Sequence, residues 1–439
     1  MSLLEYLREM PGSLAQAGLD EEWRGRKSQL QDALYQRLSS ERIAQLLVRD
    51  RAHAEREVSA VLEQLTLDAR YRGTDAQQRR CLVQEVLHLV VGLGPLEKLL
   101  DDPTVTEIMV NGPGHVFFER QGRLHASDVV FDDEQQLRMV IDRIVGPLGR
   151  RVDEQCPLVS ARLEQGHRVN VVIPPLSLDG PILTIRKFRD EVFTLEELTG
   201  KGSMEARIAQ LLRWSVVGRR NIAVSGGTGS GKTTLLNALS VEIPPWERVI
   251  TIEDAAELRF SVHPHVVRLE ARMRNIEGNG EISIRDLVLN ALRMRPDRIV
   301  VGECRGAEAL DMLQAMNTGH DGSLTTLHAN SPADVVSRLV MMARYGMDLP
   351  VEVIEEQIGA ALDLIVQVDR SASGRRRVTQ LCSCEGRQGR VRLMPLVSWD
   401  VSLQAYVWHA APPWLSVLAQ ACSLTEGEVE AWRSSLLLS

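Results

Sequence analysis

The stretch AVSGGTGSGKTTLLNAL, Ala223 to Leu239, decides the fold of this chain. The stretch begins with the end of an apolar run, continues with four glycines and a lysine, and ends in a leucine-rich helical pattern. Gly226, Gly231, Lys232 and Thr233 fit the spacing G-x-x-x-x-G-K-S/T of a phosphate-binding loop. Glycines accept left-handed backbone conformations, so several N–H groups can surround one anion. We therefore expect a strand, a phosphate-binding loop and a helix, in that order.

The chemistry of this loop predicts ATP and Mg²⁺ as its ligands. A helix beginning near Gly231 presents unpaired N–H groups and its positive dipole end to phosphates. Lys232 brings a charge to the β- and γ-phosphates, and the Thr233 hydroxyl is a suitable ligand for Mg²⁺. A glycine-rich turn without a ligand is the alternative, but the strand before the loop and the strong helix after it argue against that alternative. The predicted nucleotide contacts are Gly226, Gly227, Thr228, Gly229, Ser230, Gly231, Lys232, Thr233 and Thr234.

Strands and helices alternate around this loop from Met204 to Arg370, which predicts an α/β fold with a mostly parallel sheet covered on both faces. The expected strands are RNIAVSG, RVITIED, DRIVVGE and GSLTTLH. Residues 1–100 read as a charge-rich helical region, and residues 101–190 as a small α+β domain. We expect a linker at 191–203, the nucleotide-binding domain at 204–370, and C-terminal strands and a helix at 371–439. The run GRRR at 374–377 is expected to be a solvated hairpin end.

Three of the expected strands end in groups that suit phosphate chemistry. RVITIED leads into Glu253, Asp254 and Glu257, DRIVVGE ends at Glu303, and GSLTTLH ends at His328. Each of these residues alone has a structural explanation, because strand-end acids often cap helices and isolated histidines are often structural. The carboxyl ends of parallel strands meet at one edge of a sheet, so the set as a whole favours a catalytic site.

The combined motifs resemble the secretion-superfamily ATPases, and most of all the CpaF-type ATPase of tight-adherence (Tad/Flp) pilus assembly. The resemblance covers about Gly92 to Asp369 and implies a RecA-like P-loop NTPase domain preceded by a small α+β domain. GGTGSGKTTLLNAL matches the Walker A loop, TIEDAAEL the Asp box, RMRPDRIVVGECRG the Walker B segment, and MNTGHDGSLTTLHANSPADVVSRL the His box. The resemblance gives Glu303 the role of catalytic Walker B acid and, with Thr233, of Mg²⁺ ligand. It also assigns catalytic roles to Glu253, Asp254 and Glu257 in the Asp box and to His328 in the His box.

The resemblance also implies that the small domain takes part in catalysis. Arg168 in HRVNVV and Arg186 in LTIRKF match family arginines that reach the nucleotide across a cleft. Arg150 and Arg151 are weaker candidates for lining the same cleft or a subunit contact. Loss of the γ-phosphate would then allow the two domains to rotate about the connector at 189–203. The implied assembly is a homohexamer. Its implied partners are platform proteins of the inner membrane and, indirectly, a pilin.

Charge, hydropathy and cysteine content bear on the partners, the membrane association and the metal content that we expect. The formal net charge of -8 argues against nucleic acid as a partner. The sequence contains neither an apolar run near the ~20 residues of a membrane span nor a secretory leader, and its six cysteines are not grouped like metal ligands. We expect a cytoplasmic protein bound peripherally to the inner membrane. A type IV or type II secretion ATPase with another load stays open, as do a RecA-like nucleic-acid translocase and a scaffold that binds ATP without hydrolysing it.

Overall fold

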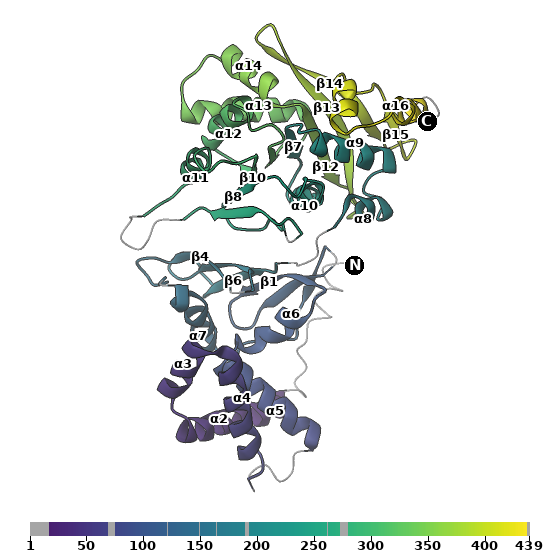
Figure 1. The fold of residues 1–439 in the computed structure, drawn as a ribbon. Coiled ribbons are helices and arrows are strands. Elements are labelled where there is room, and N and C mark those ends of the chain that lie inside the picture. Colours follow the sequence, from purple (N-terminus) through teal and green to yellow (C-terminus); the bar gives the residue numbers. More distant parts are fainter. Residues whose placement is uncertain are drawn as a thin grey trace. The chain divides into compact units, whose positions relative to one another are not determined.

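The computed structural model describes residues 17–68, 75–120, 122–148, 150–163, 165–188, 193–260, 262–272 and 280–436. The chain forms two compact units, Met1–Arg189 and Asp190–Ser439. Residues 189–192, at the start of the predicted connector, lie outside the described residues, as do the predicted helical residues before 17. Each unit has its own core and is described by itself (Figure 1).

The first unit begins with the helices that the sequence predicts, α2 (Ala17–Arg37), α3 (Ser40–Arg49), α4 (Arg51–Leu65) and α5 (Ala76–Val90). Polar side chains begin three of them, because Ser39, Asp50 and Asp75 accept hydrogen bonds from backbone N–H groups of the first turn. The helices bury a cluster of their own that includes Leu34 and Leu62. The short segments η2 (Gly94–Leu96) and α6 (Glu97–Asp101) lead into the sheet.

A six-stranded antiparallel sheet completes the first unit, with strand order β3-β2-β1-β6-β5-β4. The strands are β1 (Val105–Asn111), β2 (Val116–Arg120), β3 (Arg123–Ala126), β4 (Leu158–Arg162), β5 (Arg168–Val172) and β6 (Ile182–Arg186). One helix, α7 (Glu134–Val145), followed by η3 (Gly146–Leu148), contributes four buried residues that the sequence places on one face, Leu137, Val140, Ile141 and Ile144. Alternation along β5 and β6 buries Val169, Val171, Leu183 and Ile185 in this core.

A nine-stranded sheet forms the centre of the second unit, with strand order β15-β14-β13-β12-β7-β11-β10-β8-β9. The strands are β7 (Ile222–Ser225), β8 (Val249–Glu253), β9 (Val266–Glu270), β10 (Arg298–Cys304), β11 (Leu324–Leu327), β12 (Leu364–Arg370), β13 (Arg376–Arg387), β14 (Arg390–Asp400) and β15 (Ala405–Trp408). Those from β12 to β9 are parallel, which confirms the predicted α/β fold with a mostly parallel sheet.

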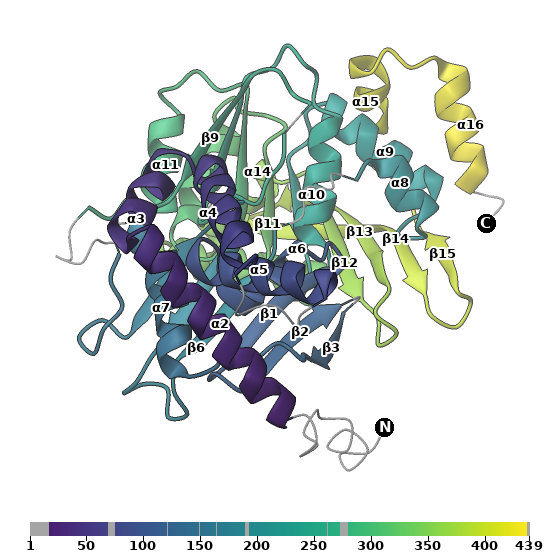
Figure 2. The same ribbon diagram turned by 90° about the horizontal axis from the view of Figure 1, so that it is seen from below.

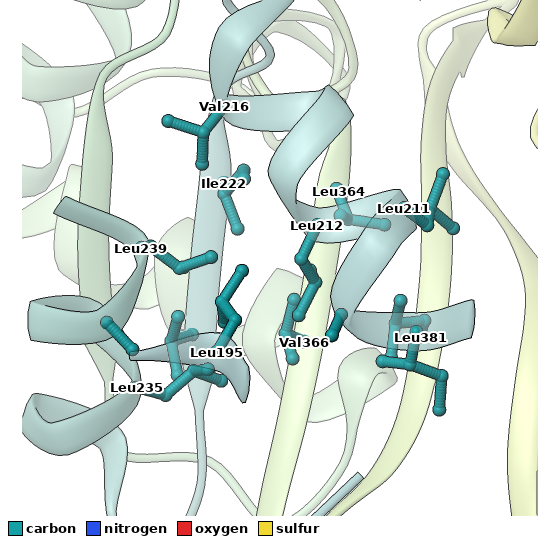
Figure 3. Close-up of a cluster of buried hydrophobic side chains, with 14 of the residues drawn as sticks. Leu195, Leu211, Leu212, Val216, Ile222, Leu235, Leu239, Leu364, Val366 and Leu381 are labelled. Atoms are coloured by element: carbon teal, nitrogen blue, oxygen red, sulfur yellow. The ribbon is translucent and has the colours of Figure 1, made fainter. Parts of the chain in front are cut away.

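Helices cover both faces of this sheet. On one face, α8 (Leu195–Gly200), α9 (Ala206–Val217), α10 (Lys232–Val241), α15 (Leu415–Ala421) and α16 (Glu426–Leu436) contribute to one core. On the other face, α11 (Ile284–Ala291), α12 (Glu308–Asn317), α13 (Pro332–Gly346) and α14 (Val351–Ala361) contribute to a second core. Figure 3 shows the first core, where Leu212 of α9 and Leu235 and Leu239 of α10 gather over Ile222, Leu364 and Val366 of the sheet.

The C-terminal strands belong to the same sheet as β7, the strand that precedes the phosphate loop. β13 pairs antiparallel with β12, and Figure 2 shows β12, β13, β14 and β15 side by side. The domain boundary predicted between residues 370 and 371 therefore lies inside the β12–β13 hairpin, so the strands on its two sides belong to one continuous sheet. Sequence patterns also missed β9 and β12. The predicted linker contains α8, whose Leu195 and Leu198 pack into the second unit because leucine burial outweighs the polar composition of its neighbours.

None of the helices within the described ranges combines the length and the apolar character needed to cross a membrane. All six cysteines are free thiols, and Cys304, Cys382 and Cys384 are buried. The described residues contain no group of three or more His, Cys, Asp and Glu side chains that could hold a metal ion.

A buried ion pair ties together the amino ends of three parallel strands. Arg298 begins β10, is fully buried, and donates through Nε and Nη2 to the carboxylate of Glu247, which precedes β8. Its Nη1 also donates to the carbonyl of Gly322, which precedes β11, at 3.2 Å. Removing one member of such a pair leaves the other charge buried without compensation.

We expect Arg298→Met to lower the free energy of unfolding by about 3 kcal/mol. Glu247 would keep its buried charge, offset in part by Arg219, whose Nη1 lies 3.6 Å from Oε1. Chemical denaturation of the full chain, followed by tryptophan fluorescence, measures this as a lower denaturant midpoint. Arg293→Met, at an exposed position nearby, is the matched control and should change stability by less than about 0.5 kcal/mol. Equal midpoints for the two variants would contradict a structural role for the ion pair.

Candidate active site

The phosphate loop lies between β7 and α10, where the sequence places it. Gly226, Gly229 and Gly231 have φ values of +157°, +69° and +103°, so they adopt conformations that other residues rarely accept. A Cβ atom added to Gly226 would lie 2.1 Å from the carbonyl oxygen of Val368 in β12. The loop is therefore wedged against the neighbouring strand, and only glycine fits at its first position.

The loop has the donors that a phosphate requires. Helix α10 begins at Lys232, and its N-cap, Gly231, makes no side-chain capping hydrogen bond. The first N–H groups of α10 and its positive dipole end are thus available to an anion. In the part of the chain that the structure describes, the buried Oγ atom of Ser230 also has no hydrogen-bond partner. These features fit a bound triphosphate.

A path of hydrogen bonds joins the loop to two other strands. The Lys232 ammonium donates to the carbonyls of Gly226 and Gly227, both at 3.0 Å, and lies 3.3 Å from Nε2 of His328. Nδ1 of His328 lies 2.9 Å from Oε1 of Glu303. Since Lys232 can only donate, Nε2 of His328 accepts and Nδ1 carries the proton. The Oγ1 atom of Thr228 lies 3.5 Å from Nε2.

The surroundings of His328 favour the neutral ring. Burial and the nearby charge of Lys232 lower the pKa of His328, while the Glu303 carboxylate raises it by a smaller amount. Arg305 and Arg338 add further positive charge and lower the pKa of the imidazole as well. A neutral imidazole with its proton on Nδ1 can donate to Glu303 and hold that carboxylate in one orientation.

Glu303 also accepts a hydrogen bond from Arg305, whose Nη2 lies 2.6 Å from Oε2. This bond, with attraction from Asp254 and Glu257, raises the pKa of Arg305. Asp254 is exposed and Glu257 is half-buried, and the charges of both act on Arg305. Arg305, which the sequence analysis did not single out, therefore pairs with Glu303 and is influenced electrostatically by Asp254 and Glu257.

Glu253 has a different environment from the other predicted acids. Its Oε2 atom accepts hydrogen bonds from the backbone N–H groups of Glu257 and Leu258 at 2.6 and 2.7 Å, and only 3% of the residue is exposed. Burial raises the pKa of Glu253 to about 7, although these two bonds oppose the rise. The carboxylate thus holds the turn that presents Asp254 and Glu257, and it faces the protein interior.

Two cavities flank His328. One, of ≈470 Å³, is lined by Gly226, Gly227, Thr228, His328, Ala329, Asn330 and Arg338. The other, of ≈250 Å³, is lined by Glu303, Cys304, Arg305, His328, Arg338, Met341, Met342 and Tyr345. Arg338 lies on α13 and lines both. It was missed because a helical arginine has no distinctive pattern, yet its helix starts directly after the strand that ends in His328, capped by Ser331.

Arg168 and Arg186 belong to the first unit, whereas the phosphate loop belongs to the second. They face each other in register on β5 and β6, and Arg162 of β4 is in register with Arg168. Residues paired in this way share one face, so three arginines form a row across one end of the sheet, on the face opposite the core residue Val169. Arg162 was not predicted.

Arg150 and Arg151 have local partners. Arg150 donates through Nη1 to the carbonyl oxygen of Ser160, and Arg151 forms a 2.6 Å ion pair with Asp153. Both contacts lie within the small domain and stabilise the segment that leads to β4.

Residues 90–422 match the protein family described as type II/IV secretion system protein. A Mycobacterium tuberculosis protein named for conjugal transfer is 38% identical over 327 residues, which cover 73% of this chain and 89% of that protein. The type IV secretion system protein VirB11 of Brucella suis is 36% identical over 306 residues, covering 63% of this chain and 84% of VirB11. The crystal structure of the Brucella suis VirB11 ATPase in complex with sulphate aligns with 32% identity over 66% of this chain and 95% of that chain, with a TM-score of 0.37.

The surroundings of His328 predict how its titration responds to its neighbours. We expect its pKa to lie below the ordinary ~6.5, to fall further in Glu303→Gln, and to rise in Lys232→Ala. Removing the carboxylate takes away the group that raises the pKa, and removing the ammonium takes away one that lowers it. Nitrogen NMR of histidine-labelled protein measures these values, with His328→Gln identifying the resonance. A pKa that is indifferent to both variants would contradict the hydrogen-bond path.

Proposed function

Because this chain belongs to the type II/IV secretion system protein family, we propose that it is an ATP-driven motor of a type IV secretion or conjugal-transfer system. The chain is an ATPase of the secretion-system class, as the sequence predicts. The observation that carries the proposal is the path from Lys232 of the phosphate loop, through His328, to the Glu303 carboxylate. This path connects the group that senses the phosphates to the group that activates water.

The loop residues 226–234 bind the triphosphate in this proposal. Backbone N–H groups of the loop and of the first turn of α10 donate to the phosphate oxygens, and Lys232 places its charge beside the β- and γ-phosphates. Mg²⁺ would be held by the Thr233 hydroxyl and the phosphates, with Glu303 at its side, and it would neutralise charge on the transferred group. Few protein ligands suffice, because Mg²⁺ commonly keeps water and substrate phosphates in its shell.

Glu303 orients the attacking water and accepts its proton. Each carboxylate oxygen has two acceptor positions, so the bonds from His328 and Arg305 leave room for a water molecule. The two bonds also fix the orientation of the carboxylate. A carboxylate that is already oriented toward the water lowers the entropic cost of reaching the transition state. Asp254 and Glu257 act through Arg305, and Glu253 supports their turn from within the core.

Arg168 and Arg186 stabilise the charge that spreads over the γ-phosphate oxygens during transfer. Their common face on the small domain, next to Arg162, supports this role because one face can approach one anion. Contacts that exist with ATP and weaken after phosphate release would move the small domain relative to the nucleotide-binding domain. The proposed moving parts are the small domain at 101–190 and the nucleotide-binding domain at 204–370, with residues 371–439 moving together with the sheet that they extend.

The names of the reported relatives favour conjugal transfer and type IV secretion over pilus assembly. The Tad/Flp pilus motor suggested by the CpaF-type resemblance is therefore the second candidate, supported by the sequence motifs alone. We further propose a homohexamer on the cytoplasmic side of the inner membrane, bound to membrane components of the secretion apparatus. The net charge of -8 favours a protein partner over nucleic acid as the direct contact.

We expect Glu303→Gln to bind ATP with near-normal affinity and to lower kcat by roughly 10²- to 10⁴-fold, because it removes the proton acceptor. Lys232→Ala should instead weaken ATP binding by roughly tenfold or more. Phosphate-release assays and calorimetric titration measure the two effects separately. Wild-type protein that releases no phosphate from ATP, alone or with its membrane partner, would refute the proposed motor.

We expect Arg168→Ala and Arg186→Ala to lower kcat by roughly 10³-fold while changing ATP affinity little, because their contacts strengthen in the transition state. Steady-state kinetics at saturating ATP gives the comparison. Arg123→Ala, at an exposed position of β3 in the same sheet, is the matched control and should be silent. Values of kcat within a few-fold of wild type in both test variants would show that these arginines take no part in hydrolysis.

A further inference from the structure

The end of the β12–β13 hairpin lies on the phosphate loop. β12 runs parallel to β7 with Gln367 beside Ser225, so its last residues continue past Gly226 and its neighbours. The turn closes through a hydrogen bond from the N–H of Ser371 to the carbonyl of Arg375, at 2.8 Å. The first residue after the turn, Arg376, donates from Nε to the carbonyl of Gly229 at 2.9 Å. The expected solvated hairpin end is confirmed, since residues 374–376 are exposed, and strand pairing also brings Arg376 to the loop.

Two arginines of this hairpin approach the loop together. Nη1 of Arg370 lies 3.7 Å from the position of a Cβ atom on Gly229, and Cδ of Arg376 lies 3.4 Å from that of Gly231. Arg370 and Arg376 are also directly opposite each other across the hairpin. Like charges in that position repel, so a bound anion between or beside them would be stabilising. Both residues are exposed, so a ligand can reach them.

Two other charged residues of the hairpin, Arg377 and Asp369, contact groups outside the phosphate loop. Arg377 stacks over the ring of Trp399, with its guanidinium carbon 3.5 Å from the ring centroid. Asp369 accepts hydrogen bonds from Thr379 and Gln367. Arg376 therefore contacts the loop and Arg370 lies near it, while Arg377 and Asp369 hold the hairpin to the rest of the sheet.

The order of the strands tells which part of a nucleotide this pair would meet. β7 lies between β12 on one side and β11 on the other, and β10 follows β11. His328 and Glu303 lie at the ends of β11 and β10, so the water-activating groups approach the loop from the side opposite to the hairpin. The hairpin arginines are therefore placed to meet the part of the nucleotide that stays after the γ-phosphate leaves.

We propose that Arg370 and Arg376 bind the α- and β-phosphates of the nucleotide held by the phosphate loop. The inference rests on the proposed function, since it needs a nucleotide in the loop. Guanidinium groups bind phosphate oxygens through charge-assisted hydrogen bonds, and the Gly229 carbonyl fixes Arg376 in place for such a contact. The C-terminal strands would then hold ADP as firmly as ATP and set the rate of its release.

The test measures the affinity of ADP and of ATP for the full chain by calorimetric titration. We expect Arg370→Ala and Arg376→Ala each to weaken ADP and ATP binding by roughly tenfold. Arg375→Ala, in the turn of the same hairpin, is the matched control and should leave both affinities unchanged. Affinity for ADP should also fall more steeply with salt in wild type than in the double variant, because two charged contacts are lost.

Three results would overturn the proposal. If Arg376 only braces the loop through Gly229, then Arg370→Ala leaves ADP affinity within twofold of wild type. If the pair meets the γ-phosphate, ATP affinity or kcat falls while ADP affinity holds. If Arg376→Ala acts by unfolding the loop, its thermal midpoint falls and Arg376→Lys does not rescue ADP binding.

The same experiment separates this proposal from the proposed function. Wild-type protein that binds ADP, with loss of binding in Lys232→Ala, establishes the nucleotide site, so silent hairpin variants would then refute the arginine pair alone. Wild-type protein that binds neither ADP nor ATP would refute both.

Discussion

The hydrogen-bonded contact between His328 and Glu303, with Lys232 on the other side of the imidazole, is the interaction on which the site depends. It exists because β7, β11 and β10 are adjacent and parallel, so their carboxyl ends meet at one edge. The neutral imidazole accepts from the ammonium and donates to the carboxylate, which couples the position of a phosphate-binding group to that of an acid. A shift of one strand by one residue would turn these side chains to the other face of the sheet.

Positive charge surrounds the loop although the whole chain is acidic. Lys232 lies in the loop itself, Arg305 directly follows β10, Arg338 comes from α13, and the hairpin contributes Arg370 and Arg376. Glu303 already pairs with Arg305, and a bound triphosphate would compensate further positive charge at the loop. In the proposed mechanism, loss of one phosphate would change that balance.

The C-terminal strands add to the sheet on the side opposite the acidic groups. β12 itself brings the carbonyl of Val368 against Gly226, and the pairing of β13 with β12 places Arg376 at Gly229. A side chain at position 226 would meet the β12 backbone. The small domain contains a separate row of arginines on one sheet face. In the proposed mechanism, recognition and hydrolysis would draw on strands of both sheets that are far apart in the sequence.

The sequence by itself determined the phosphate loop, the strands that end in Glu253, Glu303 and His328, and the α/β order, because glycine spacing and apolar periodicity act over a few residues. The tertiary structure alone decided which way each side chain faces. It turned Glu253 inward, brought Arg305 to Glu303, and laid Arg376 on Gly229. β9, which pairs with the nearby β8, also came only from the structure. So did β12 and the hairpin contact, because they join residues more than a hundred positions apart and leave no local pattern to read.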